Sequence, residues 1–346
     1  MKRLSLEEFA KKLGVSKTLV SLVLNGKGDK HGIKKETQKL VLQKAEEFNY
    51  RPNLIARGLR TGRSNVMGLI VADISNAFYA TISRSIEAEA RKLGYQMMVC
   101  STEEIGKNEE QLIEMLIGEQ NASGIIIATT QRDPEKFKSL QERGTPLVLI
   151  DRVLPKLNVD SVTVDNYKGA FEATEHLINI GYKRIGLFSI SPDFLSSISD
   201  RKKGYRDALK KHDIKFNPSL VREIPFENLR DGVFRELKEL VRPPHGIDAL
   251  FTLNNNIAAY ALEFLNESGL RIPRDVAVIS FDDVEYFRFV TPPVTAVAQP
   301  IEEIGKKAVA LLIDQINGEK KKTAHNVVLP VKLIVRKSCG AFLKNA

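Results

Sequence analysis

From Val66 onward, short apolar runs alternate regularly with amphipathic stretches, and this alternation limits the folds open to the chain. Helical spacing is present in six stretches in particular: 82–93, 109–117, 169–180, 201–211, 257–268 and 304–316. Between them lie runs rich in β-branched residues: VMGLIVAD, YQMMVCS, SGIIIAT, PLVLID, SVTVD, RIGLFSI, DALFTLN, VAVISFDD and TAVAQP. Nearly continuous apolar strands separated by helices predict parallel sheets covered by helices on both faces. Two sets of such units predict an α/β core of two doubly wound lobes.

The first 64 residues carry the whole net charge of the chain. They hold 15 Lys and Arg against 6 Asp and Glu, and the complete 346-residue chain has a net charge of +9. The rest of the chain is therefore neutral overall. A small basic block joined to a neutral body predicts binding of a polyanion by that block. The regular apolar spacing of the block distinguishes it from a solubilising tail.

Residues 1–52 have the pattern of a three-helix helix-turn-helix domain. Ser5 and Glu8 have capping-box spacing, Gly14 ends the first helix, and Ser16 can cap the second. The second helix has an apolar face and an opposite face of small, polar and basic groups. Two short helices joined by a tight turn predict that the second enters the major groove of DNA. The DNA-binding residues predicted in this domain are Ser5, Ser16, Lys17, Thr18, Ser21, Leu22 and Asn25.

Residues 53–64 predict a hinge helix or linker. Asn53 can cap a helix of about seven residues, which is too short to be stable alone in water. Apolar residues flanked by arginines are unusual in a plain linker. We therefore expect this segment to order when paired with a second copy on DNA, with Leu59 inserted into the minor groove. Asn53, Ala56 and Leu59 complete the predicted DNA-binding set.

Polar and aromatic side chains follow several of the predicted strands. In parallel sheets, ligands bind at the carboxyl ends of strands, so two lobes predict a cleft between them. Carboxylates, an amide and a guanidinium supply acceptors and donors, and aromatic rings supply flat apolar faces. That combination suits a polyhydroxylated ring. The residues at these strand ends include Asp73, Asn76, Phe78, Tyr79, Asp151, Arg201, Asn254, Asn255, Asp282 and Asp283.

Sequence patterns typical of enzymes, metal sites and membrane proteins are missing. The chain has no P-loop, no Gly-x-Ser-x-Gly elbow and no His-Glu-x-x-His. Cys100 and Cys339 are far apart and have no zinc or disulfide spacing. No run of about 18 apolar residues is present, and the N-terminus lacks the apolar stretch of a signal peptide. We expect a cytoplasmic protein that is not an enzyme and needs no cofactor.

Four segments, in this order, carry a resemblance to a known family: SLEEFAKKLGVSKTLVSLVLN, NYRPNLIARGLRTGRS, MGLIVADISNAFY and LPVKLIVRKSC. The chain resembles the lactose/galactose-repressor family of bacterial transcription regulators over essentially its whole length. The resemblance implies a core like the periplasmic sugar-binding proteins over residues 65–340. Its N-lobe spans about 65–163 and 296–323, and its C-lobe about 164–295 and 324–340. The effector-site residues it implies are Phe78, Tyr79, Asp151, Arg201, Phe226, Asn254 and Asp282.

The resemblance also implies a function. The expected protein is a homodimeric repressor of carbohydrate-utilisation genes, bound in the nucleoid to a roughly palindromic operator and controlled by a sugar or sugar derivative. Leu22 stands where the family often has Arg, which implies a different operator sequence. Three alternatives remain open: an effector that acts as a corepressor, repression triggered by a protein partner, and a sugar-binding module in transport. The basic block argues against the last.

Overall fold

The computed structural model describes residues 4–24, 26–48, 50, 64–154, 157–192, 194–242, 246–318 and 323–343. The chain divides into two compact units, Met1–Asn65 and Val66–Ala346. The predicted DNA-binding residues Asn25, Asn53, Ala56 and Leu59 lie outside the described residues, as does nearly all of the predicted hinge. None of the described helices has the length and apolar character needed to cross a membrane.

The first unit is a bundle of three short helices. The predicted capping box is present at its start: the Ser5 hydroxyl accepts a hydrogen bond from the Glu8 amide at 3.1 Å, and the Glu8 carboxylate accepts one from the Ser5 amide at 2.7 Å. Gly14 ends the first helix at a φ of 66°, a left-handed conformation that glycine adopts without strain. The elements are α1 (Leu6–Leu13), α2 (Lys17–Leu24), a 3-10 turn (Asp29–His31) and α3 (Lys35–Glu47).

Phe9 lies at the centre of this bundle. Its ring stacks on Tyr50 at 4.2 Å and meets Phe48 edge-on at 6.3 Å. Val20, Val23, Val41 and Ala45 complete the buried core. Leu40 and Phe48 are 45% and 37% exposed. Val41 and Ala45 already fill the narrow inner face of α3, so the neighbouring Leu40 is turned toward solvent.

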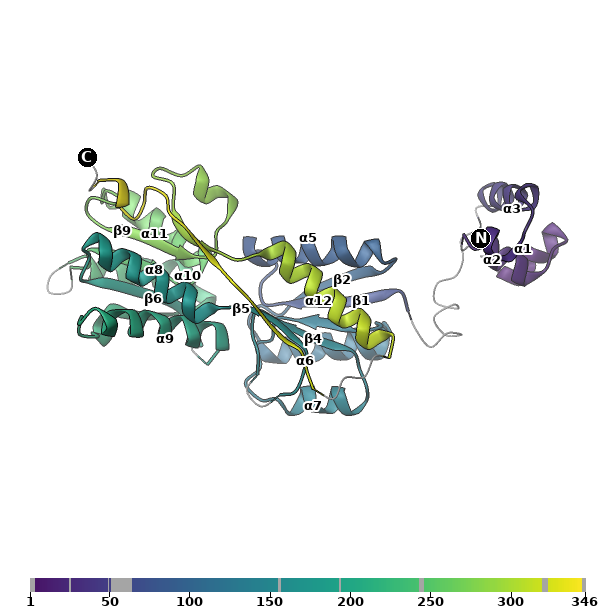
Figure 1. Ribbon diagram of the computed structural model, residues 1–346, viewed down its shortest axis with the longest axis horizontal. Helices are drawn as coiled ribbons and strands as arrows, with labels where there is room; N and C mark the ends of the chain where they lie inside the picture. The colour runs from purple at the N-terminus through teal and green to yellow at the C-terminus, as the bar shows by residue number, and fades with distance from the viewer. Residues whose placement is uncertain are drawn as a thin grey trace. The chain divides into compact units, whose positions relative to one another are not determined.

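The second unit contains two six-stranded sheets, each with helices packed against it (Figure 1). The first sheet is wholly parallel, with the order β11-β5-β4-β3-β1-β2. Its strands are β1 (Val66–Val71), β2 (Gln96–Ser101), β3 (Ile125–Ile127), β4 (Leu147–Ile150), β5 (Ser161–Val164) and β11 (Asn326–Leu329). Its helices are α5 (Ala77–Lys92) and α12 (Ile301–Ile316) in one buried cluster, and α6 (Gly106–Glu114), the π-helical turn Met115–Glu119 and α7 (Glu135–Glu142) in another.

The second sheet repeats this topology, with the order β12-β10-β9-β8-β6-β7. Every residue of β8 and β9 is buried, so helices cover both faces as predicted. One edge differs from the prediction, because β12 is antiparallel to β10. Its strands are β6 (Ile185–Ser191), β7 (Val221–Pro225), β8 (Ala249–Thr252), β9 (Ala277–Phe281), β10 (Thr295–Ala298) and β12 (Lys332–Ile334). Its helices are α8 (Asn166–Ile180), α9 (Ser196–Lys211), α10 (Leu229–Leu240) and α11 (Asn255–Glu267).

The chain passes between the two sheets three times, and two passages differ from the predicted lobe limits. β10 ends at Ala298 in the second sheet, so the second passage follows residue 298 rather than 295. β11 pairs with β5, so the third passage lies between Leu329 and Lys332 rather than near 323. Neither β11 nor β12 is among the predicted strands. They are four and three residues long, only Pro330 and Val331 separate them, and their side chains are partly exposed, as is common at sheet edges.

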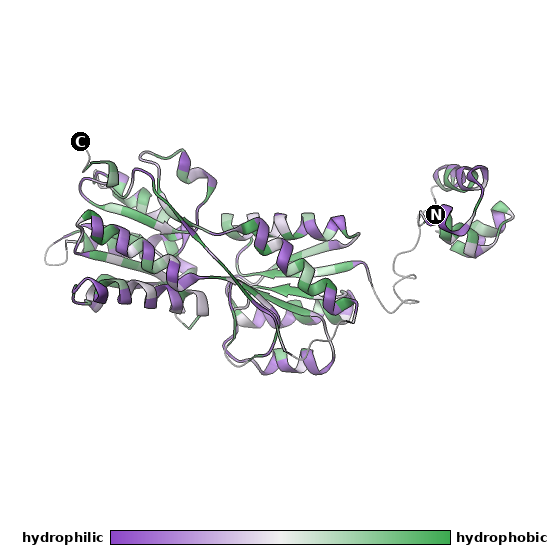
Figure 2. Cartoon of the chain, in the orientation of Figure 1, coloured by the Kyte–Doolittle hydropathy of each residue, from purple (hydrophilic) through white to green (hydrophobic). Residues whose placement is uncertain are grey.

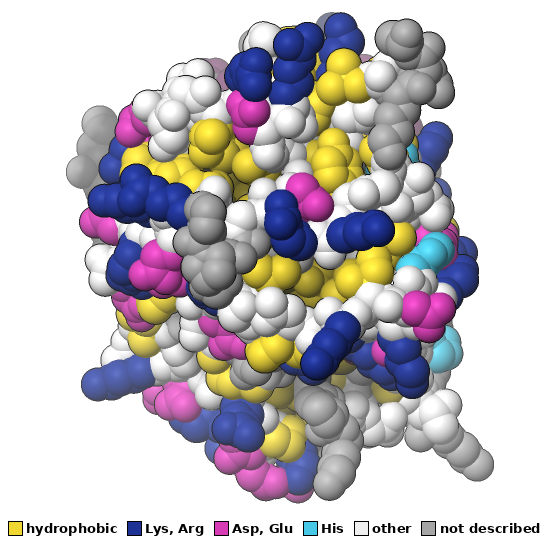
Figure 3. Space-filling model, turned by 90° about the vertical axis from the view of Figure 1, so that its left-hand side faces the viewer, with side chains coloured by type: hydrophobic (Ala, Val, Ile, Leu, Met, Phe, Trp, Pro, Cys, Tyr) yellow, Lys and Arg dark blue, Asp and Glu magenta, His cyan; other side chains and the backbone are white. Residues whose placement is uncertain are grey.

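In the second unit, hydropathy follows the secondary structure, whereas surface charges of both signs are mixed. In Figure 2 the strands are mostly hydrophobic, whereas the helices alternate between hydrophobic and hydrophilic residues. On the face shown in Figure 3, Lys and Arg side chains are interspersed with Asp and Glu. This mixture agrees with the zero net charge of the sequence after residue 64. It is typical of a solvated surface rather than of a phosphate-binding patch.

Helices α8 and α9 approach each other closely at Gly204. A Cβ added there would overlap the Tyr167 carbonyl oxygen and would lie 2.9 Å from the Phe171 amide nitrogen. Both contacts are with backbone atoms, which cannot rotate away. The absence of a side chain at Gly204 therefore sets the spacing of these two helices.

We predict that Gly204→Ala lowers the free energy of unfolding of the second unit by about 1–3 kcal/mol, because the new methyl group forces the helices apart. Gly118→Ala is the matched control, since no described atom lies within 4 Å of its added Cβ. Thermal unfolding of both variants measures the difference. Equal melting temperatures for the two variants would contradict the close approach.

Candidate functional site

The carboxyl ends of the two sheets face a common pocket. All seven predicted effector-site residues line it, and they come from both lobes. Their convergence follows from the shared topology, because each sheet directs the ends of its strands toward the other lobe. The predicted residues are joined by others that complete the lining: Asp73, Asn76, Glu104, Arg152, Ile190, Ser197, Ile198, Leu229 and Asn256.

Asp151 and Asp282 occupy equivalent places in the two lobes. Asp151 follows β4 and Asp282 follows β9, which are the third strands of the two matching sheet orders. Both have left-handed backbones, with φ of 61° and 71°. Such a conformation is uncommon for a residue with a side chain, although aspartate tolerates it better than most. Both are buried, at 8% and 4% exposure, and both line the pocket.

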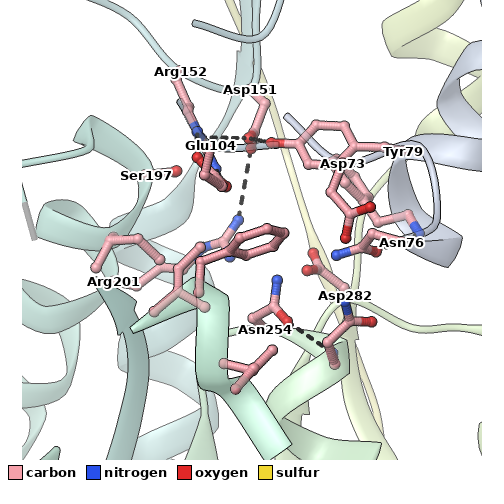
Figure 4. Close-up of a pocket in the computed structure, with 16 residues that line it drawn as sticks. Asp73, Asn76, Tyr79, Glu104, Asp151, Arg152, Ser197, Arg201, Asn254 and Asp282 are labelled. Carbon is pink, nitrogen blue, oxygen red and sulfur yellow. Dashed lines mark hydrogen bonds and ion pairs between the residues drawn. The ribbon is translucent and has the colours of Figure 1, made fainter. Parts of the chain in front are cut away.

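Asp151 connects the two lobes. Its carboxylate accepts a hydrogen bond of 2.8 Å from the Tyr79 hydroxyl, within its own lobe. On the opposite side, Arg201 Nη2 lies 3.9 Å from Asp151 Oδ1 (Figure 4). Arg201 belongs to α9 of the second lobe. A second polar contact crosses nearby, from the Val153 amide to the Ser196 hydroxyl at 2.9 Å.

The guanidinium group of Arg201 is held from three sides. Nε donates to Asn166 Oδ1 at 2.8 Å, and Nη1 donates to the Leu253 carbonyl at 2.7 Å. The Phe281 ring lies 3.6 Å from the guanidinium carbon. The sequence places Arg201 at the start of its helix, but α9 begins five residues earlier, at Ser196. These contacts leave Nη2 facing Asp151 and the pocket.

Arg152 and Glu104 form a buried ion pair in the pocket wall that the sequence analysis missed. The guanidinium donates to both Glu104 oxygens, at 2.6 and 2.7 Å, and both side chains are almost fully buried. Behind them, the buried Glu109 carboxylate accepts hydrogen bonds from Thr129 and Thr130. Burial raises the pKa of Glu109, against the opposing effect of these bonds. Arg152 directly follows the predicted Asp151 in the sequence, and this position could have indicated that Arg152 lies at the site.

Several pocket side chains use one polar atom for local structure and turn another toward the pocket. Asp73 Oδ1 accepts from the amide and hydroxyl of Ser75, at 2.8 and 2.6 Å. The Asn76 oxygen caps α5, and the Asn254 oxygen caps α11. Figure 4 shows the Asp73 carboxylate and the Asn76 and Asn254 amide nitrogens directed toward the centre of the pocket. The helix caps thus orient groups that can bind a ligand.

Asp282 and Asp283 have different partners, although the backbone of Asp282 is left-handed and not extended as the sequence pattern predicts. Asp283 forms two bonds of 2.8 Å with the guanidinium of Arg336 and so anchors the loop. Asp282 accepts a hydrogen bond of 2.6 Å from Gln299, in the second passage between lobes. Burial raises the pKa of Asp282 to about 6, whereas Arg201 and Gln299 act in the opposite direction.

The predicted DNA-reading residues lie on the exposed side of the first unit. Lys17 and Thr18, in the first turn of α2, are exposed, and Ser21 and Leu22 are half-buried. Ser5 and Ser16 are exposed and act as caps, since the Ser16 hydroxyl accepts a hydrogen bond from the Leu19 amide at 3.1 Å. The apolar side of α2 packs through Val20 and Val23 into the core.

A basic helix-turn-helix unit joined to a two-lobed binding core defines a class of regulators that bind DNA and a small molecule. Residues 5–53 match the model described as bacterial regulatory proteins, lacI family. Residues 174–339 match the periplasmic binding protein-like domain. The chain is 33% identical to the HTH-type transcriptional regulator DegA of Bacillus subtilis, over 96% of each chain. It belongs to the LacI family of DNA-binding transcriptional regulators.

Solved structures agree with this fold. The transcriptional regulator CelR–cellobiose complex is 30% identical, with a TM-score of 0.71 over 97% of this chain and all of that chain. The lac repressor dimer bound to operator and the anti-inducer ONPF has a TM-score of 0.79 and 24% identity, over 98% of this chain and 99% of that chain. Within the described part of this chain, no group of three or more His, Cys, Asp or Glu is arranged to hold a metal ion.

We predict that Asp282→Asn weakens the pH dependence of stability. The folded-state pKa of Asp282, about 6, exceeds its usual value. Its contribution to stability is therefore present below about pH 4 and is lost as the pH rises through 6. Between pH 5 and 7.5 the wild type should lose about 1–2 kcal/mol of unfolding free energy relative to the variant.

The measurement is denaturant unfolding of both proteins at the two pH values. Asp213→Asn is the control, because Asp213 has a similar backbone φ of 56° but is exposed. The same pH dependence in wild type and Asp282→Asn would show that Asp282 does not titrate in this range.

Proposed function

We propose that this protein is a homodimeric repressor of carbohydrate-utilisation genes whose affinity for a roughly palindromic operator is changed by a sugar or sugar derivative. The observation that carries the proposal is the pocket between the lobes, in which Asp151 of one lobe faces Arg201 of the other. A ligand that bonds to both residues alters the relation between the lobes. The 30% identity to a regulator whose structure contains cellobiose supports a sugar as the ligand.

The DNA-binding half of the proposal rests on α2. Its exposed first turn presents Lys17 and Thr18, while its apolar side is fixed in the bundle. A helix of this size reads one half-site, and a homodimer reads two half-sites related by symmetry. Ser21, Leu22 and Asn25 continue the proposed reading face, and Asn53, Ala56 and Leu59 contact the operator centre.

The ligand-binding half rests on the composition of the pocket. Phe78, Tyr79 and Phe226 supply ring faces for C–H groups, and the polar residues supply hydrogen bonds to hydroxyls. The effector-binding residues we propose are Phe78, Tyr79, Asp151, Arg201, Phe226, Asn254 and Asp282. The coupling between effector and operator is expected to be about 1–3 kcal/mol per effector site.

The proposed role is regulatory, without catalysis. Asp151 is engaged by Tyr79 and Arg201, and Asp282 by Gln299, so the pocket carboxylates are arranged to accept hydrogen bonds. Because its partner is genomic DNA, we propose that the protein acts in the bacterial cytoplasm and is associated with the nucleoid when bound to operator.

We predict that Lys17→Ala and Thr18→Ala each weaken specific operator binding about tenfold or more, because each removes a contact from the reading face. Lys39→Ala on the exposed side of α3 removes the same charge as Lys17→Ala and is the matched control. Gel-shift titrations with operator and random duplex measure specificity. If Lys17→Ala and Lys39→Ala lose the same operator affinity, Lys17 contributes only its charge and no specific contact.

We predict that Arg201→Ala abolishes the effector response and leaves operator affinity without effector unchanged. The variant removes the cation that faces Asp151 across the lobes. Lys210→Ala, exposed near the end of the same helix, is the control. Calorimetry and operator titration, with and without effector, measure both properties. Wild-type effector affinity in Arg201→Ala would end the assignment of this site.

A further inference from the structure

The charges that line the pocket are not balanced. Four carboxylates line it, those of Asp73, Glu104, Asp151 and Asp282, against the guanidinium groups of Arg152 and Arg201. Arg152 donates two hydrogen bonds to Glu104, and its Nε lies 3.4 Å from Asp151 Oδ2. Arg201 faces Asp151, and its charge partly opposes the effect of burial on the pKa of Asp282. Asp73 and Asp282 are left without a basic side chain at ion-pair distance among the described residues.

These two carboxylates are buried, each with 4% exposure. Their hydrogen-bond partners are neutral: Ser75 for Asp73 and Gln299 for Asp282. In each carboxylate the partners engage Oδ1. Burying a charge is costly unless an opposite charge or strong donors accompany it. The raised pKa of Asp282 is in line with this cost.

The same two carboxylates are directed toward a shared end of the pocket. In Figure 4, the carboxylates of Asp73 and Asp282 converge with the Asn76 amide between them. Asp73 follows β1 of the first lobe, and Asp282 follows β9 of the second. A cation between them would bond to both lobes, in addition to the Asp151–Arg201 contact. A group with three N–H donors fits such acceptors.

We infer that the effector is a polyhydroxylated compound that carries a protonated amine, bound between Asp73 and Asp282. This inference rests on the proposed function, because it takes the pocket between the lobes as the effector site. The ring hydroxyls bond to Asp151, Arg201 and Asn254, and the ammonium group supplies the missing positive charge. A sugar acid or sugar phosphate would add negative charge to a site that already has an excess, and the pocket excludes it.

The test uses matched sets of sugars that differ in one group. Glucose, glucosamine, glucuronate and glucose 6-phosphate form one set, and galactose, galactosamine and galacturonate form another. Thermal shift and calorimetry at pH 7 on the full chain measure binding. We expect an amine to bind about tenfold more tightly than its neutral parent, since a hydrogen bond between charged groups is stronger than a neutral one. The anionic members should not bind.

Isosteric variants test whether the charge of the two aspartates, rather than their shape, gives the preference for an amine. Asp73→Asn and Asp282→Asn keep the size of each side chain and remove its charge, so each should reduce the preference for amine over neutral sugar toward one. Glu119→Gln, exposed and outside the pocket lining, should retain the wild-type preference.

Tighter binding of a neutral or anionic sugar than of its amine, or no binding by either amine, would overturn the inference. Operator titration with each sugar distinguishes this failure from failure of the proposed function. If a neutral sugar binds and changes operator affinity, the proposed function stands and the amine inference falls. If the amines bind as expected without changing operator affinity, the preference stands and the regulatory role falls.

Discussion

The contact between Asp151 and Arg201 is the interaction on which the binding core depends. It joins the end of a strand in one lobe to a helix of the other, and each partner is fixed by its own lobe. Tyr79 orients the carboxylate, whereas Asn166, Leu253 and the Phe281 ring constrain the guanidinium. A ligand placed between these two buried charges would contact both lobes.

The repeated topology explains why the site forms where it does. Both sheets have the same order of strands, and in both an aspartate with left-handed backbone follows the third strand. Two such sheets, facing each other through three passages of chain, bring equivalent strand ends together. Gln299, in one of these passages, bonds to Asp282. A ligand that contacts Asp282 is therefore linked through one hydrogen bond to Gln299, in a chain passage between the lobes.

The two units of the chain differ in net charge. The first unit carries the excess of basic residues, and its described lysines are mostly exposed around a small aromatic core. The second unit is neutral overall, but its pocket has more carboxylates than guanidinium groups. The overall charge of the first unit favours binding of a polyanion, and we propose that the local charge of the pocket selects among small molecules.

The sequence by itself determined the class of fold and the helix-turn-helix, because apolar periodicity is a local signal. Strand-end residues indicated six of the seven effector-site candidates, whereas Phe226 came only from the family resemblance. It did not reveal the edge strands β11 and β12, which are only four and three residues long, or the true start of α9. The Arg152–Glu104 pair was also hidden, since its partners are 48 residues apart in the chain. Only the tertiary structure decided which pocket carboxylates lie beside an arginine and which do not. Ion pairing depends on distances of a few ångströms between residues that are remote in sequence.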